Sequence, residues 1–179
     1  MSNLQLTEKQ KDIVATIQSM DDDKVISLIQ DFRENGKLFV VNPLLDMIYT
    51  NRSLSLKETI LELIGDIKNQ DAAEIIVNSI QNHIGDPNTI GLLSACWQSS
   101  LDFSNYLPLF IDILCSGDYQ ASFEAFTVIE NSIGSVDLKR IDLYIATLES
   151  RLKSTPIEKH SLLTETIIML ESFKRNASE

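Results

Sequence analysis

Three acidic side chains have a spacing that could bind a basic partner. Glu58, Glu62 and Asp66 are four residues apart, so in a helix they share one face. Like charges at this spacing destabilise a helix by about a few tenths of a kcal/mol per pair. A stripe kept despite that cost could face a basic protein. The alternative interpretation is an ordinary solvated helix face. A similar segment follows 34 residues later, and its equivalent positions are not acidic: Leu92, Cys96 and Ser100.

Aromatic side chains gather in the segment 97–126, which holds 7 of the chain's 12 aromatic residues. Clustered aromatic rings supply the apolar area of a binding hot spot, but they also fill a central core. Trp97 stands at helical spacing from other apolar residues, which favours burial. Tyr106 and Tyr119 lie near expected helix starts, where a hydroxyl can reach solvent. Trp97, Tyr106 and Tyr119 are therefore candidate partner-binding residues, with core packing as the alternative for Trp97.

Patterns for metal binding and catalysis are weak. The run Asp21–Asp23 could bind a metal ion, but carboxylates also stabilise a helix N-terminus, and calcium-loop spacing is absent. His83 and His160 are far apart in the sequence, outside any metal-ligand spacing. Cys96 and Cys115 stand among apolar residues and are expected to be reduced core residues rather than a disulfide. With no nucleophile elbow or phosphate loop, we expect no catalytic residue, no cofactor and no metal.

The charge balance restricts the class of partner. The chain has 26 acidic and 15 basic residues and a net charge of −11 at pH 7. Nucleic acid would be repelled, whereas a basic protein would not. No apolar run approaches the roughly 20 residues of a membrane-spanning helix, and the polar N-terminus lacks the apolar stretch of a signal peptide. These features predict a cytoplasmic protein that binds neither nucleic acid nor membrane.

The elements that must position these side chains repeat with a period of about 34 residues, which lies within the range of known helical repeats. The positions that match across the repeat include Ile48, Ile80, Leu114 and Leu148, with the first step slightly shorter than the two that follow. Repetition at this period is typical of stacked helical pairs that bury their faces only against neighbouring pairs. The same period joins Ile67 to Leu101 and Ile76 to Phe110.

Capping residues and prolines predict ten helices joined by short connections, an all-α architecture. The segment Asn35-Gly36 is a C-terminal signal for the second helix, and Gly117 is one for the seventh. A Ser-x-x-Glu capping box is expected at the start of the fourth. The expected starts are Thr7, Asp21–Asp23, Asn42-Pro43, Ser55 with Glu58, about 71, Asp86-Pro87, about 105 with Pro108 in the first turn, Asp118, about 137, and Thr155-Pro156.

The repeat unit also carries a family-like motif. Ile64-Gly65-Asp66-Ile67 precedes Ile76-Val77-Asn78-Ser79-Ile80, and Pro108 with Phe110–Leu114 gives a second match to the latter run. This unit resembles the HEAT repeat, in which a Leu-Gly-x-Ile type helix end and an Asp turn lead to a Pro and a Leu-Ile-x-x-Leu run. The resemblance implies a right-handed α-solenoid of about five antiparallel helical pairs.

The resemblance extends over one domain, residues 1–179. It is most regular over 42–152, with divergent end units at 1–41 and 153–179. Glu74 and Asp142 stand where the typical Pro would be, and the family's Asp-Arg ladder is not visible in the sequence.

Such an array implies a scaffold that binds a peptide or partner domain on one helical face, rather than an enzyme. Two alternatives stay open. One is a small acidic inhibitor or immunity-type protein for a basic effector. The other is an enzyme of the HEAT-like class acting on DNA bases or attaching chromophores, which the charge and the lack of motifs disfavour.

Overall fold

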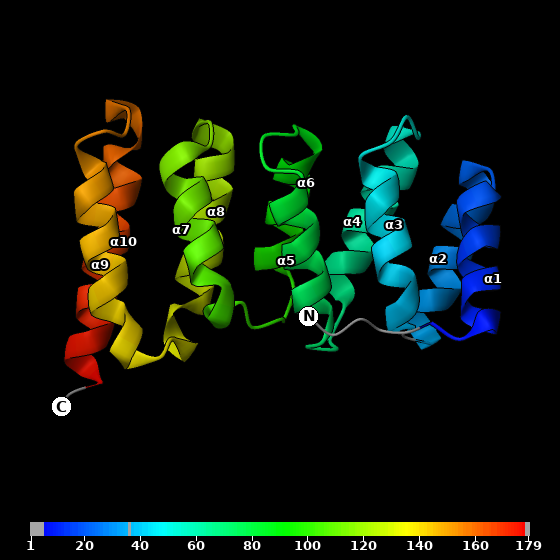
Figure 1. The fold of residues 1–179 in the computed structure, drawn as a ribbon, viewed down its shortest axis with the longest axis horizontal. Helices are drawn as coiled ribbons and strands as arrows, with labels where there is room; N and C mark the ends of the chain where they lie inside the picture. The colour runs from blue at the N-terminus through cyan, green and yellow to red at the C-terminus, as the bar shows by residue number, and fades with distance from the viewer. Residues whose placement is uncertain (1–5, 36, 178–179) are drawn as a thin grey trace.

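A computed structural model describes residues 6–35 and 37–177 (Figure 1). Over these ranges the chain is all-α, about 80% helical, with ten α-helices and no strand. The α-helices are α1 Glu8–Ser19, α2 Asp22–Asn35, α3 Val41–Ile48, α4 Leu54–Asp66, α5 Ala72–Asn82, α6 Asn88–Gln98, α7 Leu107–Ser116, α8 Tyr119–Ser132, α9 Leu138–Leu152 and α10 His160–Asn176. Short 3-10 helices are η1 Leu38–Val40, η2 Ser104–Tyr106, η3 Ile133–Ser135 and η4 Ile157–Lys159.

The helices stand in a row, and consecutive helices run in opposite directions (Figure 1). The even-numbered helices contact one another in order from α2 to α10, which makes one layer. In the other layer α1 contacts α3, α3 contacts α5, and α7 contacts α9. Within a layer, neighbouring helices therefore point the same way, and their C-terminal ends lie at the same edge of the molecule.

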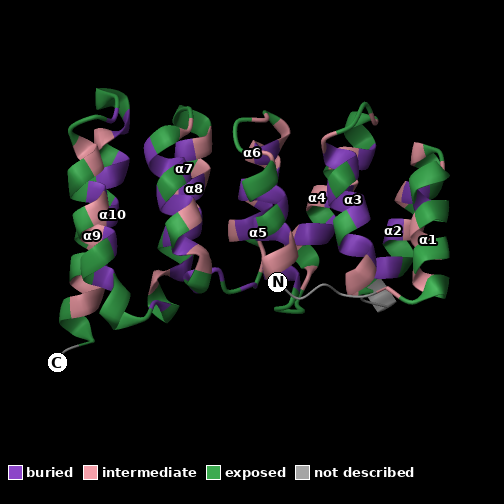
Figure 2. Cartoon of the chain, viewed as in Figure 1, coloured by how far each residue is buried: buried purple, intermediate pink, exposed green. Residues whose placement is uncertain are grey.

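Burial follows the repeat that the sequence predicts. Ile48, Ile80, Leu114 and Leu148 are all at most 1% exposed, although the sequence separates them by a whole repeat each time. Buried positions recur in every part of the row (Figure 2). These matched residues lie one on each of α3, α5, α7 and α9, so a buried apolar position recurs along the odd-numbered helices.

Most of the predicted caps are confirmed. The Thr7 hydroxyl accepts a hydrogen bond from the Gln10 N–H, and the Gln10 side chain accepts one from the Thr7 N–H, which completes a capping box. Asp118 accepts from the Ala121 N–H at the start of α8. Gly117 ends α7, as expected.

The capping box expected at Ser55 and Glu58 is wrong. Ser53 is the cap, since its hydroxyl accepts from the Leu56 N–H and α4 begins at Leu54. Leu56, which is fully buried, lies in the first turn of α4, so the cap is two residues before the predicted Ser55. Glu58 therefore lies beyond the first three helical positions and does not cap the helix.

Other boundaries moved by a few residues. A 3-10 turn precedes α3, which begins at Val41, just before the predicted Asn42-Pro43 start. Likewise η4 separates Thr155-Pro156 from α10. The predicted stop at Gly36 lies outside the described residues. Cys96 and Cys115 are buried free thiols, as predicted. No helix in the described ranges combines the length and apolar character needed to cross a bilayer.

Candidate functional site

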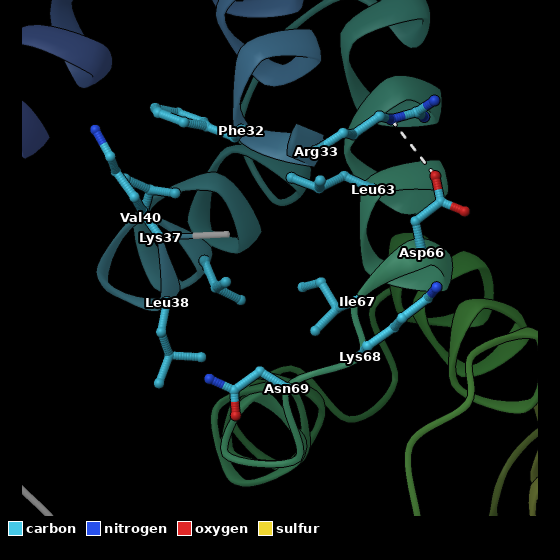
Figure 3. A pocket seen from close by; sticks show the side chains of 11 residues that line it. Phe32, Arg33, Lys37, Leu38, Val40, Leu63, Asp66, Ile67, Lys68 and Asn69 are labelled. Atoms are coloured by element: carbon cyan, nitrogen blue, oxygen red, sulfur yellow. Dashed lines mark ion pairs between the residues drawn. The ribbon is translucent and has the colours of Figure 1, made fainter. Parts of the chain in front are cut away.

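An open groove lies where α2 and α4 end. Its volume is about 310 Å³, and it is lined by the last turns of α2 and α4, by η1 with the preceding Lys37, and by the segment 67–69 (Figure 3). We call it the α2–α4 groove. Two connecting segments one repeat apart form its walls, so it belongs to the junction between successive units rather than to one helix pair.

The groove has an apolar floor. Phe32 from α2 and Leu63 from α4 are 8% and 5% exposed, and Val40 is buried beside them. Leu38 and Ile67 are half-buried and line opposite walls (Figure 3). Half-buried aliphatic side chains around an unfilled space leave apolar area in water, which an apolar group could remove by binding there.

Cations surround this floor. Among the residues whose side chains the structure describes, Arg33, Lys37 and Lys68 line the groove together with the carboxylate of Asp66. Arg33 pairs with Glu62 at 2.9 Å and with Asp66 at 3.5 Å. The groove thus holds three of the 15 basic residues of a chain whose net charge is −11. Among the lining side chains that the structure describes, cations outnumber carboxylates, whereas the whole molecule is acidic.

The next junction in the same layer is bridged by one side chain. Where α4 and α6 end, the Gln70 amide donates to the Asp102 carbonyl at 2.7 Å and accepts from the Asp102 N–H at 2.9 Å. In the preceding unit, Leu38 takes the place of Gln70, and Lys68 takes the place of Asp102. Because Leu38 has no polar group, it cannot bridge to the backbone of Lys68, and the junction stays open.

The opposite end of the α2–α4 seam is clamped. Asp22 at the start of α2 accepts from Arg52 at 2.9 Å and from the Ser53 N–H at 2.7 Å. The Arg52 guanidinium also donates to the carbonyls of Gln18 and Met20 at the end of α1. The Ser53 N–H, followed by Arg52, holds the pKa of Asp22 at about 2. The seam is therefore fixed at its N-terminal end and open at its C-terminal end.

Glu58, Glu62 and Asp66 do share one face of α4, as the spacing predicts. All three are exposed, but Arg33 lies against two of them. This cation offsets the repulsion between Glu62 and Asp66, so a partner is not required to explain the stripe. Arg33 precedes both of its partners by about one repeat, so the sequence alone could have indicated this pairing.

The three aromatic candidates do not form one surface. Trp97 is half-buried near the end of α6, and its indole N–H donates to Glu124 at 2.6 Å. Tyr119 is 53% exposed at the start of α8. Since α6 and α8 point the same way, the start of α8 and the end of α6 lie at opposite edges of their layer. Tyr106 is half-buried before α7, where burial, followed by the charge of Glu74, raises its pKa.

The other polar candidates have structural partners. Asp21 accepts from the Lys24 N–H in the first turn of α2. His83 stacks on Tyr49 with ring centroids 3.6 Å apart. No group of three or more His, Cys, Asp or Glu side chains suited to a metal ion occurs within the described part of the chain.

Sequence reasoning missed a buried lysine. Lys159 is 3% exposed, and its ammonium donates to the carbonyls of Cys115 and Gly117 at 2.8 Å each. A cation at these carbonyls stabilises the end of α7, where the helix dipole is negative. The groove cations Lys37 and Lys68 were missed as well, because nothing in the local sequence joins residues about one repeat apart.

No protein-family model matches the chain, and no curated protein or solved structure matches it.

Proposed function

We propose that this chain is a protein-interaction module, a scaffold of the HEAT-like class, which binds a segment of a partner protein in the α2–α4 groove. The observation that carries the proposal is the open junction itself: half-buried Leu38 and Ile67 line the groove, and no side chain bridges it as Gln70 bridges the next junction within the described residues. A small apolar depression surrounded by charges is a common form of recognition pocket.

The proposed architecture is a right-handed α-solenoid of about five antiparallel helical pairs, in a cytoplasmic protein that is not an enzyme. The equal burial of Ile48, Ile80, Leu114 and Leu148 supports it, because a solenoid repeats its core from unit to unit. Polar contacts across about one repeat support it too, with Arg33–Glu62, Arg52–Asp22 and Lys174–Asp142 as examples.

A second candidate function is binding of a basic protein by the even-numbered layer, as an adaptor or an inhibitor would. Exposed Glu58 on α4 and exposed Tyr119 and Phe123 on α8 favour it. Phe123 is 47% exposed and one helical turn from Tyr119, so the two rings present an apolar ridge to solvent.

Site-specific photo-crosslinking tests the first proposal. A photoreactive amino acid replaces Lys37 or Lys68 at the groove, or Lys139 or Lys153 on and after α9 as matched exposed controls. In lysate of the source cell, the two groove positions should crosslink one common protein that the control positions do not. Adding Ile67→Asp should abolish that crosslink while the helical circular dichroism stays unchanged.

Equal capture from all four positions would contradict groove binding, as would the absence of any product from positions 37 and 68. A photoreactive amino acid at position 119 tests the second candidate in the same way, and that candidate stands if Glu58→Lys/Glu62→Lys removes the crosslink formed there.

A further inference from the structure

The charges around the α2–α4 groove point to the chemistry of its occupant. We propose that it binds an acidic peptide segment in which one bulky apolar side chain is flanked by carboxylates. This inference rests on the proposed function, because it specifies the ligand of the same groove.

The two lysines have charge available for a ligand. Lys37 and Lys68 are exposed, and no ion pair joins either of them to a carboxylate within the described residues. Arg33 differs, since Glu62 and Asp66 already neutralise it. Arg33, Asp66 and Lys68 lie along one side of the opening, across from Leu38 (Figure 3). Two ammonium groups that form no ion pair with the described carboxylates, beside an apolar floor, would attract carboxylates on both sides of an inserted apolar residue.

The size of the groove limits what enters it. Its volume of about 310 Å³ lies at the low end of the roughly 300–1,000 Å³ of known ligand pockets. One bulky side chain and its neighbouring backbone would fill such a space, whereas a helix would not enter it. Phe32, Leu63 and Ile67 would supply the apolar contacts.

The net charge of −11 does not exclude an acidic ligand. At physiological salt the screening length is about 8 Å, so distant surface carboxylates act weakly on a bound peptide. Lys37 and Lys68 would be in contact with it and would therefore dominate. The long-range repulsion slows association instead, and adding salt should weaken binding by less than for a basic ligand on the acidic stripe.

Methyl NMR of the full chain, with labelled Ile, Leu and Val, tests this inference. The probes are two blocked pentapeptides, Gly-Glu-Phe-Glu-Gly and Gly-Lys-Phe-Lys-Gly. The Glu peptide should shift the methyls of Leu38, Leu63 and Ile67 with a dissociation constant of about 1 mM, and the Lys peptide should bind about fivefold more weakly. Leu143 and Ile157, exposed at a distance, should not shift.

Charge reversal provides the matched control. Lys37→Glu/Lys68→Glu should invert the order of the two peptides, whereas Lys139→Glu/Lys153→Glu should leave it unchanged. Both pairs are exposed lysines, so neither variant disturbs the core.

Equal affinity for both peptides, or preference for the Lys peptide, would overturn the acidic-ligand inference and leave groove binding intact. If neither peptide shifts the groove methyls up to about 5 mM, the inference also fails, and the photo-crosslinking result then decides the proposed function separately. If the same methyls shift when the protein alone is concentrated, the occupant is a second copy of this chain, which again overturns it.

Discussion

The α2–α4 junction and the α4–α6 junction have the same place in successive units, yet of these two only the second is bridged by a polar side chain. Gln70 holds both backbone groups of Asp102, whereas Leu38, one unit earlier, has no hydrogen-bonding side chain. The difference teaches that one residue type at a junction can decide whether a side chain bridges two successive connecting segments. The same α2–α4 seam is clamped at its other end by Asp22.

The largest expected difference between the junctions concerns the matched residues Ile67 and Leu101. Leu101 is 7% exposed, although it also lines an opening of about 270 Å³ between the ends of α6 and α8, while Ile67 is half-buried in the α2–α4 groove. We expect Leu101→Ala to lower the free energy of unfolding by about 3 kcal/mol and Ile67→Ala by about 1 kcal/mol. Urea denaturation with equal m-values measures both. Equal losses would break the comparison, because they would mean that Ile67 is packed as tightly as Leu101.

The clamp itself gives the next largest effect. Gln70→Leu places at the bridged junction the residue type that the open one has, and it removes two hydrogen bonds. We expect the free energy of unfolding to fall by about 1–2 kcal/mol and amide exchange at Asp102 to accelerate. The control is Gln120→Leu, at an exposed position of α8. A loss no larger than that of the control would show that Gln70 does not hold the junction.

Acid titration tests the clamped end of the α2–α4 seam. The folded pKa of Asp22 is about 2, below its ordinary value of 3.8, so the folded state binds this proton less readily. The stabilisation is therefore complete above about pH 4 and is lost as the pH falls from about 4 to 2. We expect Asp22→Asn to lower stability at pH 7 and to flatten its dependence on pH over that window. An unchanged slope would contradict the role given to Asp22.

The smallest effect on stability is expected from Leu38→Gln, the converse exchange. It loses part of a half-buried aliphatic contact and gains a bridge to the backbone of Lys68, so the free energy of unfolding should change by less than about 0.5 kcal/mol. Slower amide exchange at Lys68 would report the new bridge. A loss comparable to that of Ile67→Ala would mean that the glutamine is not accommodated.

The helices and the repeat could be predicted because their signals are local or periodic. The side chains of Thr7 and Asp118 cap helices through hydrogen bonds to residues three positions away, and the buried set from Ile48 to Leu148 repeats at nearly constant offset. The start of α4 was missed because Ser53 and Ser55 both resemble caps. The choice between them depends on Leu56 being buried and on Asp22, about one repeat away, holding the Ser53 N–H.

The groove could not be predicted in the same way. Its walls come from connecting segments one unit apart. It is open because the Leu38 side chain cannot form hydrogen bonds to the backbone of Lys68. The repeat does contain a partial signal, since aligning the units places Leu38 on Gln70 and Arg33 about one period before Glu62 and Asp66. A comparison of charged residues between successive units, rather than along one helix, would have predicted the ion pairs of Arg33 with Glu62 and Asp66. Whether the stripe and the aromatic candidates Trp97, Tyr106 and Tyr119 bind a partner remains a prediction.

A peptide-display selection tests the central claim, that the open α2–α4 junction is the recognition site, most directly. Peptides selected on the wild-type chain are measured for affinity to Leu38→Gln, whose new side chain we expect to bridge the groove, and to Gln120→Leu as control. We predict that the selected peptides combine an aromatic or bulky aliphatic residue with acidic neighbours, and that Leu38→Gln weakens them about tenfold or more while Gln120→Leu does not. Peptides that bind both variants as tightly as wild type would contradict the account.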